Sequence, residues 1–184
     1  MTVSSALLPS PLGALIIAAT RDGVCGITFE DDEGRFAGKA EWRGRQKGVT
    51  LTYLDVSGLS PLSEEQRVLK EAAGALKGYF SGSPEPFTLP LVPSSTPFQR
   101  SVWSLIMTIP YGETRSYRWV AERLGMRGGA RAVGGACGSN PIPIIIPCHR
   151  VIASDGAIGG YSGGGRGEGI SIKRRLLALE GVTV

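Results

Sequence analysis

The stretch that divides this chain is Ser81–Gln99, with the sequence SGSPEPFTLPLVPSSTPFQ. Residues 81–95 contain four prolines and no helical spacing of apolar residues, so they predict an extended linker. Thr96 and Gln99 then form a capping box with Pro97 in the first turn, a combination that starts a helix. The stretch therefore predicts two domains, residues 1–80 and residues 96–184, on either side of the linker.

The residues before the linker have the pattern of a small antiparallel sheet followed by a helix. Ala14–Ala19 and Val24–Phe29 are apolar, partly β-branched runs separated by a turn, and they predict a hairpin. A charged loop is expected at 30–48 and a third strand at Val49–Val56. A capping box opens Ser63–Phe80, whose apolar residues recur at helical spacing. We therefore expect an α/β N-terminal domain.

The residues after the linker predict several short helices. The helix that Thr96 opens is followed by a second from Ser116 to Leu124 and a third from Ala130 to Cys137. Because a glycine-containing turn joins the second and third helices, this pair resembles a helix-turn-helix. Ile172–Glu180 predicts a closing helix. The expected fold is therefore a mostly α C-terminal domain with a helix-turn-helix.

The composition excludes several classes of protein. With 184 residues, 42% of them hydrophobic and 20% charged, the chain can bury a core, which argues against disorder. The wholly apolar stretches fall far short of the ~20 residues of a membrane span, and no signal peptide is recognisable. Three cysteines without CxxC spacing do not make a disulfide framework. We therefore expect a cytoplasmic protein, nuclear if eukaryotic, with reduced thiols.

The charge is unevenly distributed along the chain. Residues 1–93 hold 9 Lys and Arg against 11 Asp and Glu, a net of −2, whereas residues 94–184 hold 11 against 5, a net of +6. A basic C-terminal half suggests contact with a polyanion, although an ordinary solvated basic surface explains the charge equally well.

Cys148 and the chain's single histidine, His149, are adjacent in the apolar segment Pro141–Ile152, PIPIIIPCHRVI. This segment is too rich in proline for a helix and too apolar for the surface, so it delivers both residues to the interior or to a cleft. A cysteine beside a histidine and Arg150 is a candidate nucleophile, because positive charge favours the thiolate. In an extended segment the two side chains point to opposite faces, so proton transfer between them requires a water or a sharp turn.

The alternatives to a nucleophilic cysteine have weaker support. No pair among the cysteines and the histidine has the spacing of a structural zinc site, so we expect no metal. A Walker-type loop and a strand-placed GxGxxG are both absent from the sequence, so we expect no nucleotide cofactor.

Pro147-Cys148-His149-Arg150-Val151 resembles the active-site signature of the O6-alkylguanine-DNA alkyltransferases. Further motifs occur in the order of that family: Ile109-Pro-Tyr-Gly-Glu-Thr-Arg-Ser-Tyr117, Ala130-Arg-Ala-Val-Gly-Gly135, Asn140-Pro141, Gly160-Tyr-Ser-Gly163 and Leu176-Leu-Ala-Leu-Glu180. The resemblance is close over residues 96–181 and general over residues 1–95.

This resemblance implies roles for five residues in the chemistry. Cys148 takes the alkyl group from O6 of guanine by in-line displacement. His149 acts as its base through a water and is oriented by Glu180, while Asn140 links the turn to the cysteine segment by hydrogen bonds. Tyr117 donates a proton or a hydrogen bond to the leaving guanine. The residue types agree with this chemistry, because a thiolate is a strong nucleophile and an anionic guanine needs a proton donor.

The resemblance also implies how the damaged base is reached and held. An enzyme that acts on a paired base must first extrude it from the duplex. Arg131 would enter the duplex and fill the gap, while Tyr161, Ser162 and Val151 would bound the base pocket. The residues implied to face DNA are Ser116, Ala130, Arg131 and Gly134.

Each of these residues taken alone has an ordinary structural interpretation. Tyr117 and Tyr161 fit core aromatic residues, Arg131 a solvated helix position, and Glu180 a helix-end carboxylate. Only their joint spacing around the cysteine segment favours the functional interpretation. We interpret the other two cysteines, Cys25 and Cys137, as small structural hydrophobic residues.

The expected function is DNA repair by direct reversal. The protein would transfer an alkyl group irreversibly from O6 of guanine, and also from O4 of thymine, to its own cysteine, once per molecule. The expected partner is duplex DNA carrying O6-alkylguanine, and the protein is expected to be a monomer without a cofactor or membrane contact. A non-catalytic alkylguanine-binding protein, disfavoured by the presence of Cys148, and a helix-turn-helix regulator are the alternatives.

Two features depart from the family pattern. The N-terminal half has one cysteine and no histidine, so the zinc site of some family members is not expected. Gly165–Gly169 is an apparent insertion, which leaves the closing edge of the pocket and the preferred size of the alkyl group open.

Overall fold

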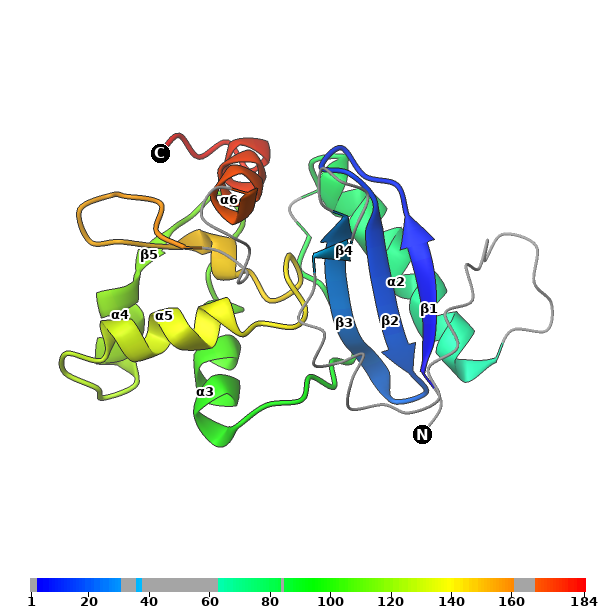
Figure 1. Cartoon of the computed structure of the whole chain (residues 1–184), viewed down its shortest axis with the longest axis horizontal. Coiled ribbons are helices and arrows are strands. Elements are labelled where there is room, and N and C mark those ends of the chain that lie inside the picture. Colours follow the sequence, from blue (N-terminus) through cyan, green and yellow to red (C-terminus); the bar gives the residue numbers. More distant parts are fainter. Residues whose placement is uncertain (1–2, 31–35, 38–62, 84, 161–167) are drawn as a thin grey trace. The chain divides into compact units, whose positions relative to one another are not determined.

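The structure is a computed structural model that describes residues 3–30, 36–37, 63–83, 85–160 and 168–184 of the chain (Figure 1). The chain divides into two compact units, residues 1–94 and residues 95–184, here called the N-terminal and C-terminal units. Residues 81–94, the greater part of the predicted linker, thus belong to the N-terminal unit.

The N-terminal unit contains an antiparallel sheet with the strand order β1-β2-β3-β4. The strands are β1 (Ser4–Leu8), β2 (Leu15–Thr20), β3 (Gly23–Glu30) and β4 (Phe36–Ala37). The predicted hairpin is β2 and β3, and β2 is buried along its whole length. β1 lacks β-branched residues and forms because every residue in it pairs with β2.

The loop expected at 30–48 needs a correction. Residues 36 and 37 form β4 because they pair with Glu30 and Phe29 at the end of β3. A two-residue strand has almost no signature of its own in the sequence. The strand predicted at Val49–Val56 lies outside the described residues.

The predicted helix after Ser63 is confirmed as α2 (Glu64–Phe80). The Ser63 hydroxyl accepts a hydrogen bond from the Gln66 amide at 3.3 Å, and the Gln66 side chain accepts one from the Ser63 amide at 2.8 Å. Figure 1 shows α2 across one face of the sheet, where it packs on β2 and contacts β1 and β3. Its buried side chains are Val68, Leu69, Ala72, Ala73, Leu76 and Tyr79.

The segment at 90–92 is bound to the sheet of the N-terminal unit. Val24 donates its amide to the Pro90 carbonyl, and Val92 donates its amide to the Val24 carbonyl, both at 2.9 Å. This approach requires Gly23, which has a φ of +149° and where a Cβ would lie 2.4 Å from the Pro90 oxygen.

The C-terminal unit begins with α3 (Pro97–Ile106), and both hydrogen bonds of its predicted capping box are present. The buried Trp103 of α3 donates its indole N–H to the Ala136 carbonyl at 2.9 Å and so ties α3 to α5 (Ala130–Gly138). The other long helix is α6 (Glu168–Leu179). It begins four residues earlier than predicted, so the last two residues of the apparent insertion, Glu168 and Gly169, belong to a helix.

The predicted helix pair is α4 (Tyr117–Arg123) and α5, which pack on each other and on α3. The turn between α4 and α5 contains Gly125 and Gly128, both in the left-handed region. Ser116, the last residue of β5 (Arg115–Ser116), caps α4 by accepting a hydrogen bond from the Trp119 amide at 3.0 Å. β5 pairs in parallel with β6 (Val151–Ile152), and this pairing fixes the start of α4 beside the cysteine segment.

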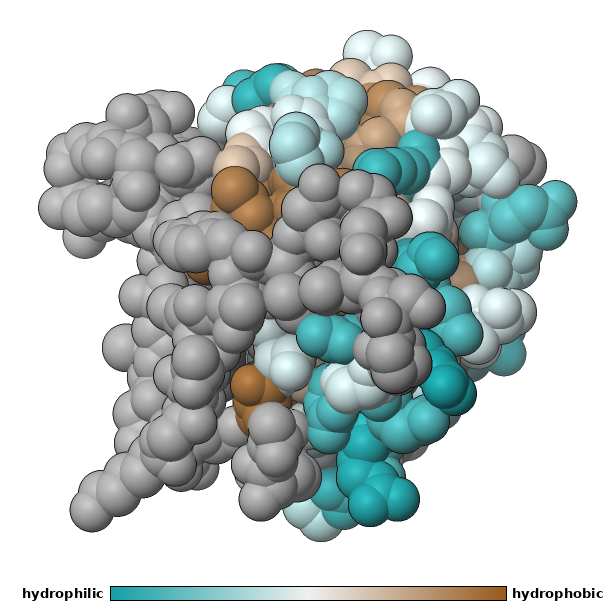
Figure 2. Space-filling model, turned by 90° about the vertical axis from the view of Figure 1, so that its right-hand side faces the viewer, coloured by the Kyte–Doolittle hydropathy of each residue, from teal (hydrophilic) through white to brown (hydrophobic). Residues whose placement is uncertain are grey.

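The side of the molecule shown in Figure 2 has mostly polar or neutral residues among those with defined colours. On the side shown in Figure 2, hydrophobic residues occupy only small, separate areas among the residues with defined colours. Among the described residues, no helix combines the length and the apolar character that a membrane crossing requires.

Candidate active site

The sequence analysis expects an extended segment at the cysteine, but the structure has a different conformation there. Cys148–Arg150 form a short 3-10 helix, closed by a hydrogen bond from the Arg150 amide to the Pro147 carbonyl at 3.0 Å. A tight turn precedes it, with Ile144 at a φ of +75°. A β-branched residue in this region is strained, and such strain persists only where the surroundings impose it. The buried isoleucines around the turn impose it here.

Asn140 holds this turn against the cysteine. Its side-chain amide donates to the Ile146 carbonyl at 2.8 Å and to the Cys148 Sγ at 3.1 Å, and its oxygen accepts from the Ile142 amide at 2.9 Å. Asn140 and Cys148 are both buried. The thiol is therefore fixed in place by a donor that stabilises its anionic form.

The environment of Cys148 combines opposing effects on its acidity. Burial raises the pKa of the Cys148 thiol, while the Asn140 hydrogen bond and the positive charge of Lys173 act in the opposite direction. Burial has the larger effect, so the resting residue is a thiol. A base must remove its proton before it can act as a nucleophile.

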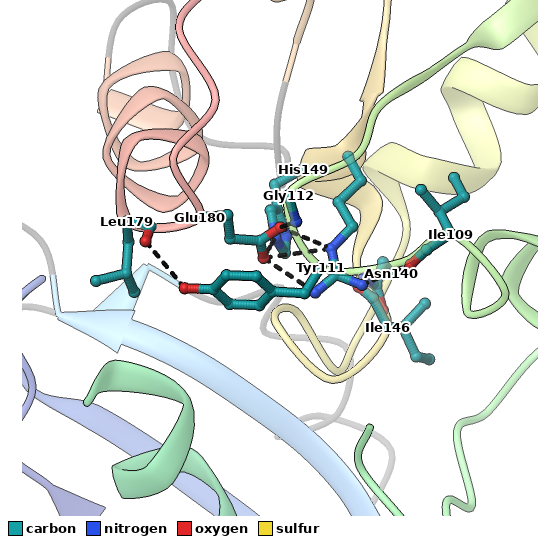
Figure 3. Close-up of polar contacts among 9 residues, drawn as sticks. Ile109, Tyr111, Gly112, Asn140, Ile146, His149, Leu179 and Glu180 are labelled. Carbon is teal, nitrogen blue, oxygen red and sulfur yellow. Dashed lines mark hydrogen bonds and ion pairs between the residues drawn. The ribbon is translucent and has the colours of Figure 1, made fainter. Parts of the chain in front are cut away.

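The other side of the 3-10 helix carries a buried network centred on Glu180 (Figure 3). Glu180 accepts from His149 Nε2 at 2.7 Å, from Arg150 Nε at 2.9 Å and from the Gly112 amide at 3.1 Å. Burial by itself would raise the pKa of Glu180, but its hydrogen bonds and ion pairs with His149 and Arg150 lower it to about 2. Glu180 is therefore a carboxylate at neutral pH.

The protonation of His149 follows from this network. Burial lowers the pKa of His149, and this effect outweighs the opposite influence of Glu180. His149 is therefore neutral at physiological pH. Because a carboxylate only accepts hydrogen bonds, the single ring proton lies on Nε2. Nδ1 then carries the lone pair, as a general base requires.

Arg150, which the sequence analysis considered only as a positive charge beside Cys148, belongs instead to the network around Glu180. Its guanidinium bonds to Glu180 and donates to the Ile109 carbonyl. It also lies 5.9 Å from the centre of the Tyr111 ring, and Tyr111 donates its hydroxyl to the Leu179 carbonyl at 2.9 Å. Arg150 thus fixes Glu180 and joins the loop at 109–112 to the end of α6. The sequence contained one signal for this role, because Arg150 directly follows His149.

Lys173 is a residue that the sequence analysis did not assign. It is fully buried on α6, where it donates to the Val151 carbonyl at 2.6 Å and to the Tyr117 hydroxyl at 3.3 Å. The sequence contained a signal that could have found Lys173, because it lies at helical spacing from the other buried residues of α6 and its end, which recur every three or four residues. These positions are Gly169, Lys173, Leu176, Leu177 and Glu180.

The residues expected to face DNA lie on α4 and α5. Ala130 and Gly134 are half-buried and Arg131 is exposed. A hollow of about 840 Å³ lies beside Arg131 and is also lined by Arg118 and Arg127. Ser116 is half-buried, and its hydroxyl accepts the capping hydrogen bond of α4. The structure thus places three arginines on the helix-turn-helix, where they suit contacts with phosphates.

The other expected site residues are placed only in part. Tyr161 and Ser162 lie outside the described residues, whereas Val151 is buried and its carbonyl accepts from Lys173. Cys25 is half-buried, and burial raises its pKa to about 11. Cys137 is buried, which raises its pKa as well. Neither thiol is therefore ionised at neutral pH.

Two family models match the chain and together cover almost all of it. Residues 97–182 match the 6-O-methylguanine DNA methyltransferase, DNA binding domain, and residues 3–93 match the 6-O-methylguanine DNA methyltransferase, ribonuclease-like domain. The two matches meet near the boundary between the two structural units.

Known proteins agree with these matches over more than nine-tenths of their length. The methylated-DNA–protein-cysteine methyltransferase of Methanosarcina barkeri is 39% identical over 174 residues, which span 95% of this chain and 94% of the relative. The crystal structure of the Mycobacterium tuberculosis O6-methylguanine methyltransferase is similar with a TM-score of 0.75 and 35% identity, covering 97% of this chain and 93% of that one. The same protein in complex with DNA gives a TM-score of 0.74 at 35% identity, over 96% and 92% of the two chains.

A buried thiol held by an asparagine, a neutral histidine on a carboxylate, and a helix-turn-helix with exposed arginines thus occur in a chain that matches these proteins over more than nine-tenths of its length. The chain belongs to the methylated-DNA–protein-cysteine methyltransferase family.

Proposed function

We propose that the protein repairs DNA by moving an alkyl group from O6 of guanine in duplex DNA to Cys148. In this reaction a bond forms between Cys148 Sγ and the alkyl carbon while the bond from that carbon to O6 breaks, and the electron pair remains on guanine. The observation that carries the proposal is the 3.1 Å hydrogen bond from Asn140 to a buried cysteine, next to the His149–Glu180 pair. We extend the substrates to O4 of thymine, which carries the same kind of alkyl ether.

The cysteine loses its proton to His149. Since His149 Nε2–H is bonded to Glu180, the base is Nδ1, and a water carries the proton from Cys148 to it. The carboxylate of Glu180 stabilises the imidazolium that forms, and Arg150 keeps Glu180 in its place. The thiolate that results is stabilised by the Asn140 amide and reacts at the alkyl carbon.

The departing guanine needs a proton or a hydrogen bond because it leaves as an anion. Tyr117 is the donor in this proposal, since its half-buried hydroxyl accepts a hydrogen bond from the ammonium of Lys173, which also donates to the carbonyl of Val151. Tyr161 and Ser162 complete the pocket, as the family resemblance implies. A thioether on Cys148 offers water no leaving group, so each molecule acts once.

Intact mass spectrometry after incubation with a duplex that contains O6-methylguanine tests the proposal. We expect the mass to rise by one methyl group on Cys148, and to rise no further with excess DNA. Cys148→Ala should show no gain and still bind DNA, while Cys137→Ala should gain the methyl group. Methylation of another residue, or more than one repaired lesion per molecule, would contradict the proposal.

Arg131 fills the space of the extruded nucleotide in this proposal. Arg131→Ala should slow repair of duplex DNA by about tenfold or more, because tenfold corresponds to only about 1.4 kcal/mol and unstacking a base step costs a few kcal/mol. Transfer from the free base O6-benzylguanine, which leaves no gap, should keep its rate. Equal losses on the two substrates would show that Arg131 does not have this role.

A further inference from the structure

Two side chains of α3 reach the C-terminal end of α5. Trp103 donates its indole N–H to the Ala136 carbonyl at 2.9 Å, and Gln99, one turn earlier, donates its side-chain amide to the Ser139 hydroxyl at 2.8 Å. The Ser139 hydroxyl in turn donates to the Ala136 carbonyl at 2.9 Å. The end of α5 is therefore held by α3 at two points, and the next residue along the chain is Asn140.

The direction of each hydrogen bond around Gln99 is fixed by its partners. The side-chain oxygen of Gln99 accepts from the Thr96 backbone amide at 2.8 Å, and because a backbone amide can only donate, the side-chain nitrogen faces Ser139. Gln99 thus has two separate contacts: its oxygen caps α3, and its nitrogen holds the end of α5. The capping box explains the first contact and not the second, which joins residues 40 positions apart in a partly buried place.

The position of Asn140 depends on the end of α5. Its backbone amide donates to the Cys137 carbonyl in the last turn of the helix at 3.2 Å, and its side chain donates to Cys148 Sγ at 3.1 Å. A hydrogen bond weakens steeply as its geometry departs from the optimum, so a shift of Asn140 weakens its bond to the sulfur. This bond opposes the effect of burial on the pKa of Cys148. A shift at the end of α5 would therefore raise the pKa of the thiol and slow the formation of the thiolate.

We propose that Gln99 is a positioning residue for Cys148 and that it acts through Ser139 and Asn140. The hydrogen bond from Gln99 holds Ser139 in place, and this keeps the Asn140 amide directed at the sulfur. Through its oxygen, the same side chain joins the start of the C-terminal unit at Thr96 to the surroundings of the thiol. The proposal rests on the alkyl transfer proposed above for the role of Cys148, and it adds a residue that sets the reactivity of this thiol.

The first experiment measures how fast iodoacetamide alkylates Cys148 over a range of pH, by mass spectrometry of the peptide that contains this residue. Ser139→Ala removes the partner of Gln99 and leaves the capping box of α3 intact. It should slow alkylation at neutral pH by about three- to tenfold, the equivalent of one ordinary hydrogen bond. Its rate profile should also move to higher pH, because a weaker bond from Asn140 leaves the pKa of the thiol higher. Gln99→Met should have the same two effects, and it keeps the proposal testable if Ser139→Ala does not fold.

Thr96→Ala is the matched control, because it removes the other half of the capping box and leaves the Gln99–Ser139 bond in place. It should destabilise α3, as the loss of an N-cap side chain does, and leave the alkylation rate and its pH profile unchanged. If Thr96→Ala slowed alkylation as much as Ser139→Ala does, a loss of helix stability would explain both results, and the proposal would fail. These three variants all keep the titratable groups that face Cys148, which are Tyr117, Cys137, Lys173 and the adjacent His149.

Double variants test whether the effect of Gln99 passes through Ser139 and Asn140. Gln99→Met combined with Ser139→Ala should be no slower than the slower of the two single variants. Gln99→Met combined with Asn140→Ala should be no slower than Asn140→Ala, because the donor to the sulfur is already missing. Losses that multiply in either double variant would overturn the proposal.

Transfer from O6-benzylguanine separates this proposal from the proposed function. Ser139→Ala should lose the same factor with iodoacetamide and with O6-benzylguanine, since both react at one thiol. If the wild-type protein transfers the benzyl group, and Ser139→Ala reacts with iodoacetamide at the wild-type rate and with an unchanged pH profile, the positioning role of Gln99 fails and the proposed function stands. If the wild-type protein gains no benzyl group while Ser139→Ala still slows the reaction with iodoacetamide, the proposed function fails and the positioning of the thiol stands.

Discussion

The two units of the molecule differ in which polar groups they bury. Among the described residues, the buried polar side chains of the N-terminal unit are three hydroxyls, Ser5, Thr20 and Thr28. The C-terminal unit buries an amide, a histidine, a carboxylate and two cations: Asn140, His149, Glu180, Arg150 and Lys173. Buried hydroxyls need only a nearby carbonyl, whereas buried charges need partners in fixed geometry. The C-terminal unit therefore bears the desolvation cost of the buried charged groups at its candidate active site, and the described residues of the N-terminal unit bear no such cost.

Among the changes that test this contrast, Glu180→Gln should reduce the free energy of unfolding most. Removing the carboxylate leaves Arg150 without its buried counter-charge, and breaking such a pair costs about 3–5 kcal/mol. That is a large part of the roughly 5–15 kcal/mol by which a domain is stable. Transfer to Cys148 should also fall, because His149 loses the group that orients it. Denaturant unfolding followed in parallel with benzyl transfer measures both effects.

The pH dependence of the same variant sharpens this prediction. The pKa of Glu180 is held at about 2 in the folded protein, below the value of about 4.3 of a free glutamate. Its contribution to stability is therefore present above about pH 4.3 and is lost as the pH falls toward 2. Glu180→Gln should lack the decrease in this range. A variant that retained it would show that another group is responsible.

Gly23→Ala should cause a smaller loss of stability, which is confined to the N-terminal unit. The new Cβ would lie 2.4 Å from the Pro90 oxygen, at a φ of +149° that side chains rarely adopt. Overpacking typically costs about 1–3 kcal/mol, and the backbone strain adds to it. Gly74→Ala in α2 is the matched control: a Cβ there has no neighbour within 4 Å, so stability should rise by about 0.5–1 kcal/mol.

Both glycine variants also test whether chemistry is limited to the C-terminal unit. At temperatures where each variant is folded, its rate of benzyl transfer should equal that of the wild-type protein. A slower rate in folded Gly23→Ala would contradict the contrast between the units, because it would give the sheet a part in the reaction.

The smallest loss of stability is expected from the alkylation of Cys148 by the transfer reaction itself. An alkyl group on Cys148 enters a buried site beside Asn140, and overpacking there should cost about 1–3 kcal/mol. Thermal unfolding before and after stoichiometric reaction with O6-methylguanine DNA measures it, with Cys148→Ala treated in the same way as the control. Hydrogen exchange should increase in the C-terminal unit and not in β1–β3. An unchanged or higher melting temperature would contradict the prediction.

Local signals in the sequence were sufficient for most helices. The capping boxes at Ser63 and Thr96 are complete within four residues, and both helices begin where they indicate. The strands β1 and β4 were not resolved from the sequence because their stability comes from pairing with β2 and β3 and not from their own residues. At the cysteine, where the sequence analysis expects an extended segment, Cys148–Arg150 form a 3-10 helix after a tight turn at Ile144, among isoleucines that are buried by tertiary packing.

In the candidate site, too, some features follow from the sequence and others only from tertiary packing. The sequence by itself predicted the candidate nucleophile and its neighbours, because Cys148, His149 and Asn140 lie within ten residues and match a specific family signature. Only the tertiary structure decided the states of these groups. Glu180 reaches His149 across 31 positions, and Lys173 reaches Tyr117 across 56. Burial and hydrogen bonding, which set the pKa values of His149, Glu180 and Lys173, arise only when those distant segments pack together.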